Sequence, residues 1–189
     1  VANATAALAG LPPSYDAARI EIAFIEAYIH SRDPAGDAMV VAMLDRAEHL
    51  LGSAELEPAD AACFAARLVD HRAYRCNHSG RLEEGLALYE SLADAEAHPF
   101  ASYRRDAGRA YGYYRAGRIA DAVRTARAAC QHAGDGGYIR LRAMGLLLLA
   151  RILGAEGAPE RARARAIAER LDDGELRARV ERAEQITPA

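Results

Sequence analysis

Lysine is absent from this chain of 189 residues, and all 24 of its basic residues are arginine. A phosphate-binding P-loop uses a lysine that reaches the phosphates, and a Schiff-base enzyme uses a lysine amine as its nucleophile. The composition therefore excludes both chemistries. The sequence also contains no nucleophile elbow, no glycine-rich dinucleotide fingerprint and no paired carboxylates in a recognisable context, so we expect neither an enzyme nor a cofactor site.

Tryptophan is absent too, and aromatic residues make up only 6% of the chain although hydrophobic residues make up 51%. Most of the apolar residues are alanine and leucine, whereas valine and isoleucine are sparse. No segment alternates between apolar and polar residues in the way that a half-buried strand does. The composition therefore predicts an all-α protein whose helices pack closely against one another.

Long apolar runs are missing, and cysteines are few. The longest apolar run, at residues 145–150, is far shorter than the ~20 residues that span a bilayer. Cys63, Cys76 and Cys130 form an odd set at wide spacing, which is typical of a reduced protein rather than of a disulfide-bonded one. We therefore expect a cytoplasmic protein without a membrane segment.

Charge of one sign does not dominate, because the formal net charge is −3. Residues 1–60 carry a balance of −7 and residues 61–189 a balance of +4, which we interpret as ordinary surface variation. Nucleic-acid-binding domains are usually strongly basic. We therefore expect no nucleic-acid partner.

A repeated pattern is what the sequence does contain. Arg72-Ala73-Tyr74 is followed by Gly80-Arg81-Leu82, and 37 residues later Arg109-Ala110-Tyr111 is followed by Gly117-Arg118-Ile119. In each copy a helical stretch ends at the glycine and another begins at once. A period in the thirties is typical of an array of helix-turn-helix repeats.

Proline and glycine divide the chain into nine expected helices, because proline favours the first position of a helix and glycine the position just past its end. Pro34, Pro58, Pro99 and Pro159 are the start signals, and Gly52, Gly80, Gly117 and Gly157 are the end signals. The expected helices lie near 14–31, 36–51, 59–78, 81–95, 99–116, 118–133, 138–154, 159–171 and 174–186. Residues 1–13 are expected to form a tail, or a linker from a preceding domain of a larger protein.

The pattern resembles that of the tetratricopeptide repeat family. In that family a small residue and an aromatic one precede the turn glycine, and a small and a bulky residue follow it in the second helix. The matching residues are Ala73, Cys76, Gly85 and Tyr89 around Gly80; Ala110, Tyr113, Ala122 and Ala126 around Gly117; and Ala150, Leu153, Ala162 and Ala166 around Gly157. The chain departs from the family at Arg72, Arg109 and Asp106, where apolar or aromatic residues are usual, and in its periods of 37 and 40 residues instead of 34.

The resemblance implies a right-handed superhelical solenoid of antiparallel helix pairs. A single domain would cover residues 14–189, with pairs near 14–51, 59–95, 99–133 and 138–171 and a charged capping helix near 174–186. Its function would be that of a protein–protein interaction scaffold, as in the repeat region of a larger bacterial regulator.

In that family the first helix of each pair lines a concave groove that binds a peptide. Carried over onto this sequence, the groove consists of Arg67, His71, Tyr74, Asn77, His78, Arg104, Tyr111, Tyr114 and Arg115. A looser fit adds Met144, Leu147 and Arg151, and the first helix adds His30. Tyrosine supplies contact area at low entropic cost, and arginine binds carboxylates in bidentate fashion. The expected ligand is therefore an extended, acidic peptide segment or a free C-terminus.

Other interpretations of the same residues remain open. The tyrosines and arginines of the groove can instead pack between helices or pair with neighbouring acids. His71, Cys76 and His78, or Cys130 and His132, lack the spacing of a zinc site, so we expect no metal. The basic run around Tyr103 and Arg109 is a weak candidate for phosphate contact.

Two alternative functions also remain. One is a sensor domain that encloses a small molecule or signalling peptide in an aromatic pocket. The other is self-assembly into a homodimer through Val40, Val41, Met43 and Leu44, if these side chains are exposed.

Overall fold

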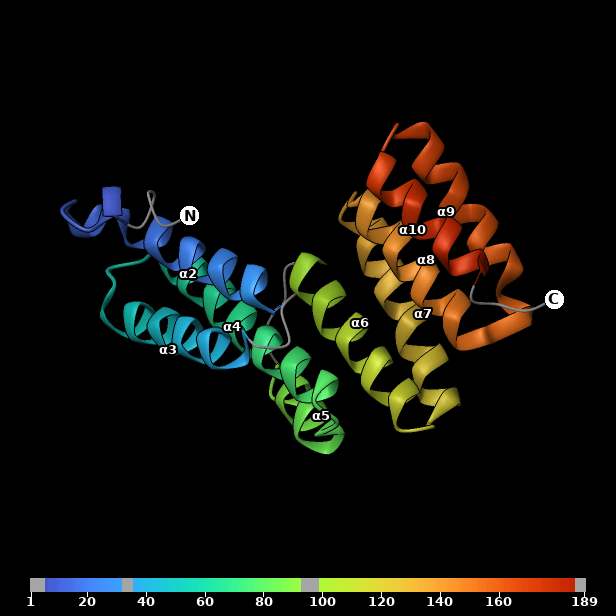
Figure 1. The fold of residues 1–189 in the computed structure, drawn as a ribbon, viewed down its shortest axis with the longest axis horizontal. Helices are drawn as coiled ribbons and strands as arrows, with labels where there is room; N and C mark the ends of the chain where they lie inside the picture. The colour runs from blue at the N-terminus through green and yellow to red at the C-terminus, as the bar shows by residue number, and fades with distance from the viewer. Residues whose placement is uncertain (1–5, 32–35, 93–98, 186–189) are drawn as a thin grey trace. The chain divides into compact units, whose positions relative to one another are not determined.

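The computed structural model describes residues 6–31, 36–92 and 99–185, and these residues form helices with no strand (Figure 1). The helices are α2 (Asp16–His30), α3 (Asp37–Ser53), α4 (Pro58–His78), α5 (Leu82–Glu90), α6 (Pro99–Arg115), α7 (Ile119–Asp135), α8 (Ile139–Leu153), α9 (Ala158–Arg170) and α10 (Gly174–Gln185), with short 3-10 helices η1 (Pro13–Tyr15) and η3 (Gly154–Gly157). The prediction of an all-α protein is confirmed for these residues.

The helix boundaries follow the proline and glycine signals closely. Pro58 and Pro99 are the first residues of α4 and α6, as expected. The fourth helix is shorter than expected, because α5 ends at Glu90 and a turn follows at residues 91–92. The rest of its expected range, 93–95, and the start signal at Pro34 lie outside the described residues.

Gly80 and Gly117 end their helices in the same way. Each has a positive φ, of 84° and 74° respectively, which only glycine adopts without steric cost. In each turn the next backbone N–H donates to the carbonyl five residues earlier, from Arg81 to Cys76 and from Arg118 to Tyr113, both at 2.9 Å. This arrangement satisfies carbonyls that the end of a helix leaves without partners. The two copies of the sequence repeat are therefore two copies of one turn.

Gly157 does not act as a third copy of that turn. Helix α8 already ends at Leu153, and η3 lengthens the connection to α9. The buried residues of α9 are consequently Ala164 and Ala168, whereas the expected Ala162 and Ala166 are exposed. The register predicted for this helix was wrong by two residues, because the inserted 3-10 turn has no signal in the repeat pattern.

The chain divides into two compact units, unit 1 at Val1–Arg72 and unit 2 at Ala73–Ala189. The single repeat domain expected over 14–189 stays a prediction. In unit 1, helix α2 packs on α3, and Phe64 and Leu68 of α4 complete the core around Ile20 and Phe24. Arg19 of α2 donates hydrogen bonds to backbone carbonyls of the preceding segment, including that of Leu8 at 2.8 Å.

The proposed self-assembly residues of α3 belong to this core. Val40 and Leu44 are buried, with 6% and 2% of their surface exposed, and Val41 and Met43 are half-buried. The condition attached to the homodimer, that these side chains be exposed, is therefore not met for Val40 and Leu44.

In unit 2, helices that follow one another in the chain pack against each other (Figure 1). Two further contacts join helices that are two apart in the chain, α6 with α8 and α8 with α10. Alanines make this close packing possible: Ala110, Ala122, Ala126 and Ala143 are all 0% exposed. Among the described residues, no helix combines the length and the apolar character that crossing a membrane requires. The leucine-rich run at 145–150 lies within α8, where it supplies much of the core.

Asp173 fixes the start of α10, which closes unit 2. Its Oδ1 accepts a hydrogen bond of 2.9 Å from the Leu176 backbone N–H, and its Oδ2 lies 2.7 Å from Nε of Arg140 on α8. The bond from Leu176, and then the bond from Arg140, hold the pKa of the Asp173 carboxyl below its usual value. The carboxylate therefore stabilises the fold at neutral pH.

We expect Asp173→Ala to lower the melting temperature at pH 7 by about 2–4 °C, the usual effect of losing a helix cap in a chain of this size. Asp173→Asn should lose less, because it keeps an acceptor for the backbone N–H. The pKa of the Asp173 carboxyl is lower in the folded than in the unfolded protein. The stability that the carboxylate contributes is therefore fully present above the unfolded pKa of about 3.9, and it is lost as the pH falls through the folded pKa. In thermal melts of both variants, followed by circular dichroism, the difference from the wild type should thus shrink as the pH falls below about 3.9; a difference that persists undiminished contradicts this role.

Candidate functional site

Three aromatic rings from two helices of unit 2 stack at its surface. Tyr74 and His78 lie one turn apart on α4, with ring centroids 3.8 Å apart. Tyr111 of α6 also stacks on the imidazole, with a centroid distance of 5.0 Å. Tyr74 is 49% exposed and His78 is exposed, so this stack is accessible from solvent.

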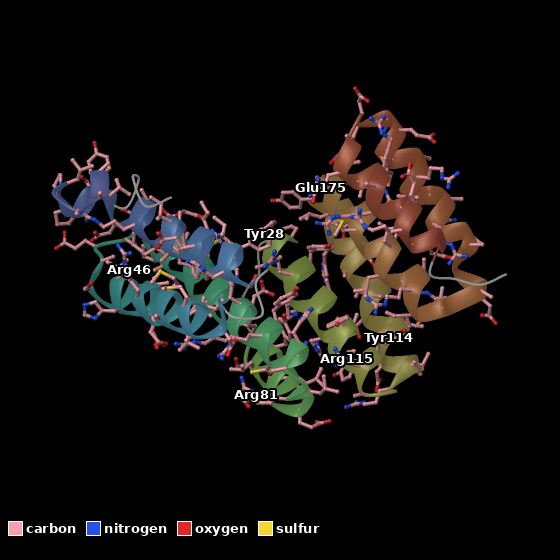
Figure 2. The ribbon with its side chains drawn as sticks, in the orientation of Figure 1. Tyr28, Arg46, Arg81, Tyr114, Arg115 and Glu175 are labelled. Carbon is pink, nitrogen blue, oxygen red and sulfur yellow. The ribbon has the colours of Figure 1, made fainter. Side chains whose placement is uncertain are left out.

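Two arginines extend the stack toward α8. Arg115 lies one turn after Tyr111, and its Nη1 donates a 3.2 Å hydrogen bond to the Tyr111 hydroxyl. Arg151 of α8 places its guanidinium 6.0 Å from the Tyr111 ring centroid and 5.5 Å from that of Tyr114. Tyr114 and Arg115 extend from the last turn of α6 (Figure 2). Cations at such distances are attracted to the faces of aromatic rings.

We call these six residues the aromatic–arginine surface: Tyr74, His78, Tyr111, Tyr114, Arg115 and Arg151. Among the described residues, no carboxylate pairs with Arg115 or Arg151. Some other arginines of unit 2 do have such partners; Arg118, for example, lies 2.9 Å from Asp121, and Arg140 lies 2.7 Å from Asp173. The surface therefore presents two guanidinium groups that aromatic rings position and that no described carboxylate neutralises.

Five of the nine predicted groove residues belong to this surface, and Asn77 does not. Asn77 is only 1% exposed, and its Nδ2 donates a 3.2 Å hydrogen bond to the Gly108 carbonyl of α6. It packs one helix against the other and is covered from solvent. Arg104 lies half-buried on α6, two turns before Tyr111.

Arg67 and His71 belong to a different cluster, in unit 1. The His71 ring stacks on Phe24 at a centroid distance of 5.2 Å, and the Arg67 guanidinium lies 4.7 Å from the same ring. Arg67 also forms an ion pair with Glu21. These two side chains therefore join α4 to α2 within unit 1. In unit 2, by contrast, Arg151 of α8 lies beside Tyr111, although the family pattern matched this arginine only loosely.

No protein-family model, curated protein sequence or solved structure matches this chain. What the chain does must therefore be inferred from the chemistry of its own residues. The feature that stands out in that respect is the aromatic–arginine surface, because it combines accessible rings with positive charge that has no described counter-charge.

The basic run on α6 has a different environment from the surface. Asp106, which is 4% exposed, lies 2.9 Å from Arg105, 3.3 Å from His132 of α7 and 3.8 Å from Arg109. Asp106, where the chain departs from the family pattern, is thus a buried carboxylate with three cationic or ionisable groups around it. A buried carboxylate without such partners would be strongly destabilising. Arg105 and Arg109 neutralise Asp106 within α6, and the contact of Asp106 with His132 joins α6 to α7.

The candidate metal ligands do not converge. His71 stacks on Phe24, the His78 ring contacts two tyrosine rings, and His132 contacts Asp106. Within the described ranges, no group of three His, Cys, Asp or Glu side chains is placed to hold a metal ion. Burial raises the pKa of the Cys130 thiol to about 11, so at neutral pH it is protonated and is a poor metal ligand and nucleophile.

Proposed function

We propose that unit 2 is a tetratricopeptide-like repeat array that binds an extended, acidic peptide segment of a partner protein on its aromatic–arginine surface. In this proposal the end of α4, together with α6 and α8, represents the first helices of successive repeats. Affinity comes from the two arginines and from the tyrosine rings, and is on the order of micromolar, or about −8 kcal/mol.

The arrangement of helices supports the repeat proposal. Contacts between α6 and α8, and between α8 and α10, join helices that are two apart in the chain, as first helices are in a stacked array. The two matched turns at Gly80 and Gly117 repeat after 37 residues. A stack of helix pairs brings side chains from successive first helices to one face, which suits a ligand that is longer than a single residue.

The observation that carries the functional proposal is the placement of Arg115 and Arg151. Both guanidinium groups lie within 6.0 Å of one tyrosine ring centroid, and neither has a carboxylate partner among the described residues. A guanidinium binds a carboxylate through two parallel hydrogen bonds, and the ring beneath it restricts its motion before the ligand arrives. The surface thus offers preorganised anion recognition beside apolar contact area.

Fluorescence anisotropy with two labelled octapeptides tests the proposal. The acidic probe alternates aspartate with leucine, and the neutral probe alternates asparagine with leucine. Each peptide is titrated with the protein at pH 7 and low salt. We expect the acidic probe to bind at least about tenfold more tightly than the neutral probe and to weaken as salt is added, because exposed charge interactions are screened. Equal affinities for the two probes, or no binding of either, would overturn the proposal.

The sensing alternative needs an enclosed aromatic pocket. A cavity in unit 1 has a volume of about 20 Å³ and is lined by Leu8, Ala9, Arg19, Ile22 and Arg46. That volume suits about one water molecule, and no aromatic side chain lines it. This cavity does not favour the sensing alternative, whereas the aromatic–arginine surface favours peptide binding.

A further inference from the structure

We infer that the aromatic–arginine surface binds acidic ligands with uptake of a proton, and that His78 is the residue that takes it. The inference rests on the proposed function, because it concerns how the same surface responds to its ligand. It assigns to His78 a role distinct from that of the two arginines: their charge is constant, whereas the charge of His78 depends on the ligand.

The hydrogen bonding of His78 determines which ring nitrogen carries the proton in the neutral form. Nδ1 lies 2.9 Å from the backbone carbonyl oxygen of Tyr74. A carbonyl oxygen can only accept a hydrogen bond, so Nδ1 must be the donor and must carry a hydrogen. The neutral imidazole therefore has its free lone pair on Nε2, and Nε2 is the atom that gains the second proton.

Two tyrosine rings lie against the imidazole, and its Nε2 edge is accessible. The ring centroids of Tyr74 and Tyr111 are 3.8 Å and 5.0 Å from that of the imidazole. His78 is nevertheless an exposed residue, and no described residue forms a hydrogen bond with Nε2. A ligand on this surface can therefore approach Nε2 directly.

Arginines of α6 and α8 lie beside the stack that contains His78. Arg115 of α6 and Arg151 of α8 both contact Tyr111, which stacks on the imidazole, and Arg75 precedes His78 by three residues on α4. At the start of α5, Arg81, which precedes the helix, pairs with Glu84 at 3.0 Å, so the two add little net charge. Arg115 and Arg151 are therefore the fixed positive charges that an acidic ligand meets beside the imidazole.

An acidic ligand changes the charge around the imidazole. Its carboxylates neutralise the arginines and add negative charge beside Nε2, so the imidazolium becomes favourable in the complex. An imidazole ordinarily gains its charge between pH 8 and 5, whereas aspartate side chains stay ionised down to about pH 4. Affinity for an acidic ligand must therefore rise as the pH falls from 8.0 to about 5.8, because one more proton is bound in the complex than in the free protein.

The test is the affinity of the acidic probe at pH 8.0 and pH 5.8, at constant ionic strength, for the whole chain and three variants. We expect the wild type to bind about three- to fivefold more tightly at the lower pH, which is the usual worth of one exposed ion pair. His78→Gln should bind with nearly the same affinity at both values. His78→Arg, with a permanent charge, should bind at pH 8.0 about as tightly as the wild type does at pH 5.8. His49→Gln, an exposed histidine of α3 in unit 1, is the matched control and should keep the wild-type ratio.

The outcomes separate this inference from the proposed function. If the acidic probe binds no better than the neutral probe at either pH, the proposed function fails and the inference fails with it. If the acidic probe binds but its affinity is the same at both pH values, or if His78→Gln keeps the full ratio, only the inference is overturned. Circular dichroism of each variant establishes that the helices are retained, and isothermal titration calorimetry in phosphate and in Tris buffer at pH 7 measures the proton uptake independently.

Discussion

Replacing Arg115 and Arg151 together by alanine should weaken binding of the acidic probe by about 100-fold, or about 2.7 kcal/mol. Hydrogen bonds to charged groups contribute about 1.5–3 kcal/mol each, and two that act on one ligand are not fully additive. Each single variant should lose about twentyfold, so that the loss in the double variant is smaller than the product of the two single losses. Anisotropy titrations at pH 7 measure all three, and the affinity for the neutral probe should change little.

The matched control is Arg127→Ala with Arg163→Ala. These two arginines are also exposed residues of unit 2, on α7 and α9, and no described carboxylate pairs with either. The control removes the same charge from the protein without changing the aromatic–arginine surface. If this control lowers the affinity for the acidic probe as much as the double replacement on the aromatic–arginine surface does, binding reflects net charge alone, and the site assignment is wrong.

Replacing both arginines by lysine instead should give an intermediate loss. Lysine keeps the charge, but it lacks the planar fork that binds a carboxylate at two points and stacks on a ring. A complete retention of affinity in this variant would mean that charge alone attracts the ligand, without the rings taking part.

Gly157→Ala should destabilise the protein by about 2–3 kcal/mol, the typical cost of forcing an extra methyl group into a packed core. Gly157 is buried against the backbone of α8, and an added Cβ would lie 2.6 Å from the Ala150 Cα and closer still to its carbonyl oxygen. Backbone atoms of a helix cannot move aside by changing rotamer. The connection between α8 and α9 would therefore have to shift. Equilibrium unfolding in urea, followed by circular dichroism, measures the loss.

Gly52→Ala provides the comparison, because it makes the same change where space is available. Gly52 lies in α3, and nothing comes within 4 Å of an added Cβ. Alanine favours a helix over glycine by up to about 1 kcal/mol, so this variant should be unchanged or slightly stabilised. Losses of equal size in the two variants would contradict the close approach at Gly157.

The turns of the repeat could be predicted from the sequence because their chemistry is local. Gly80 and Gly117 are needed where the backbone has a positive φ, and that requirement depends only on neighbouring residues. Proline at the first position of a helix is a local signal of the same kind. These signals were sufficient to place nearly every helix of the described residues.

Gly157 and the buried residues of α9 could not be predicted in this way. The glycine there is required by the approach of a different helix, and in sequence it looks the same as a turn glycine. The four residues of η3 shift the buried face of α9 by two positions, and only the packing of Ala164 and Ala168 reveals it. The deviation is tertiary in origin, so a repeat pattern taken from one sequence does not contain it.

Part of the aromatic–arginine surface could be predicted from the sequence, because helical periodicity is a local property. Tyr74 and His78, or Tyr111 and Arg115, are one turn apart, and helical periodicity places each pair on one face. Asn77 is adjacent to His78 in sequence but turns inward to Gly108, because neighbouring residues of a helix lie on different faces. Which arginine of α8 lies beside Tyr111 depends on how two helices pack, and therefore only the structure identifies Arg151.

Nuclear magnetic resonance of the arginine side chains tests most directly whether an acidic peptide binds at Arg115 and Arg151. The Nε–Hε signals of the two arginines are assigned with the single alanine variants and followed during titration with the acidic probe. We expect these two signals to shift in proportion to the bound fraction while those of Arg127 and Arg163 stay in place. Shifts at Arg127 and Arg163 with none at Arg115 and Arg151 would contradict the claim.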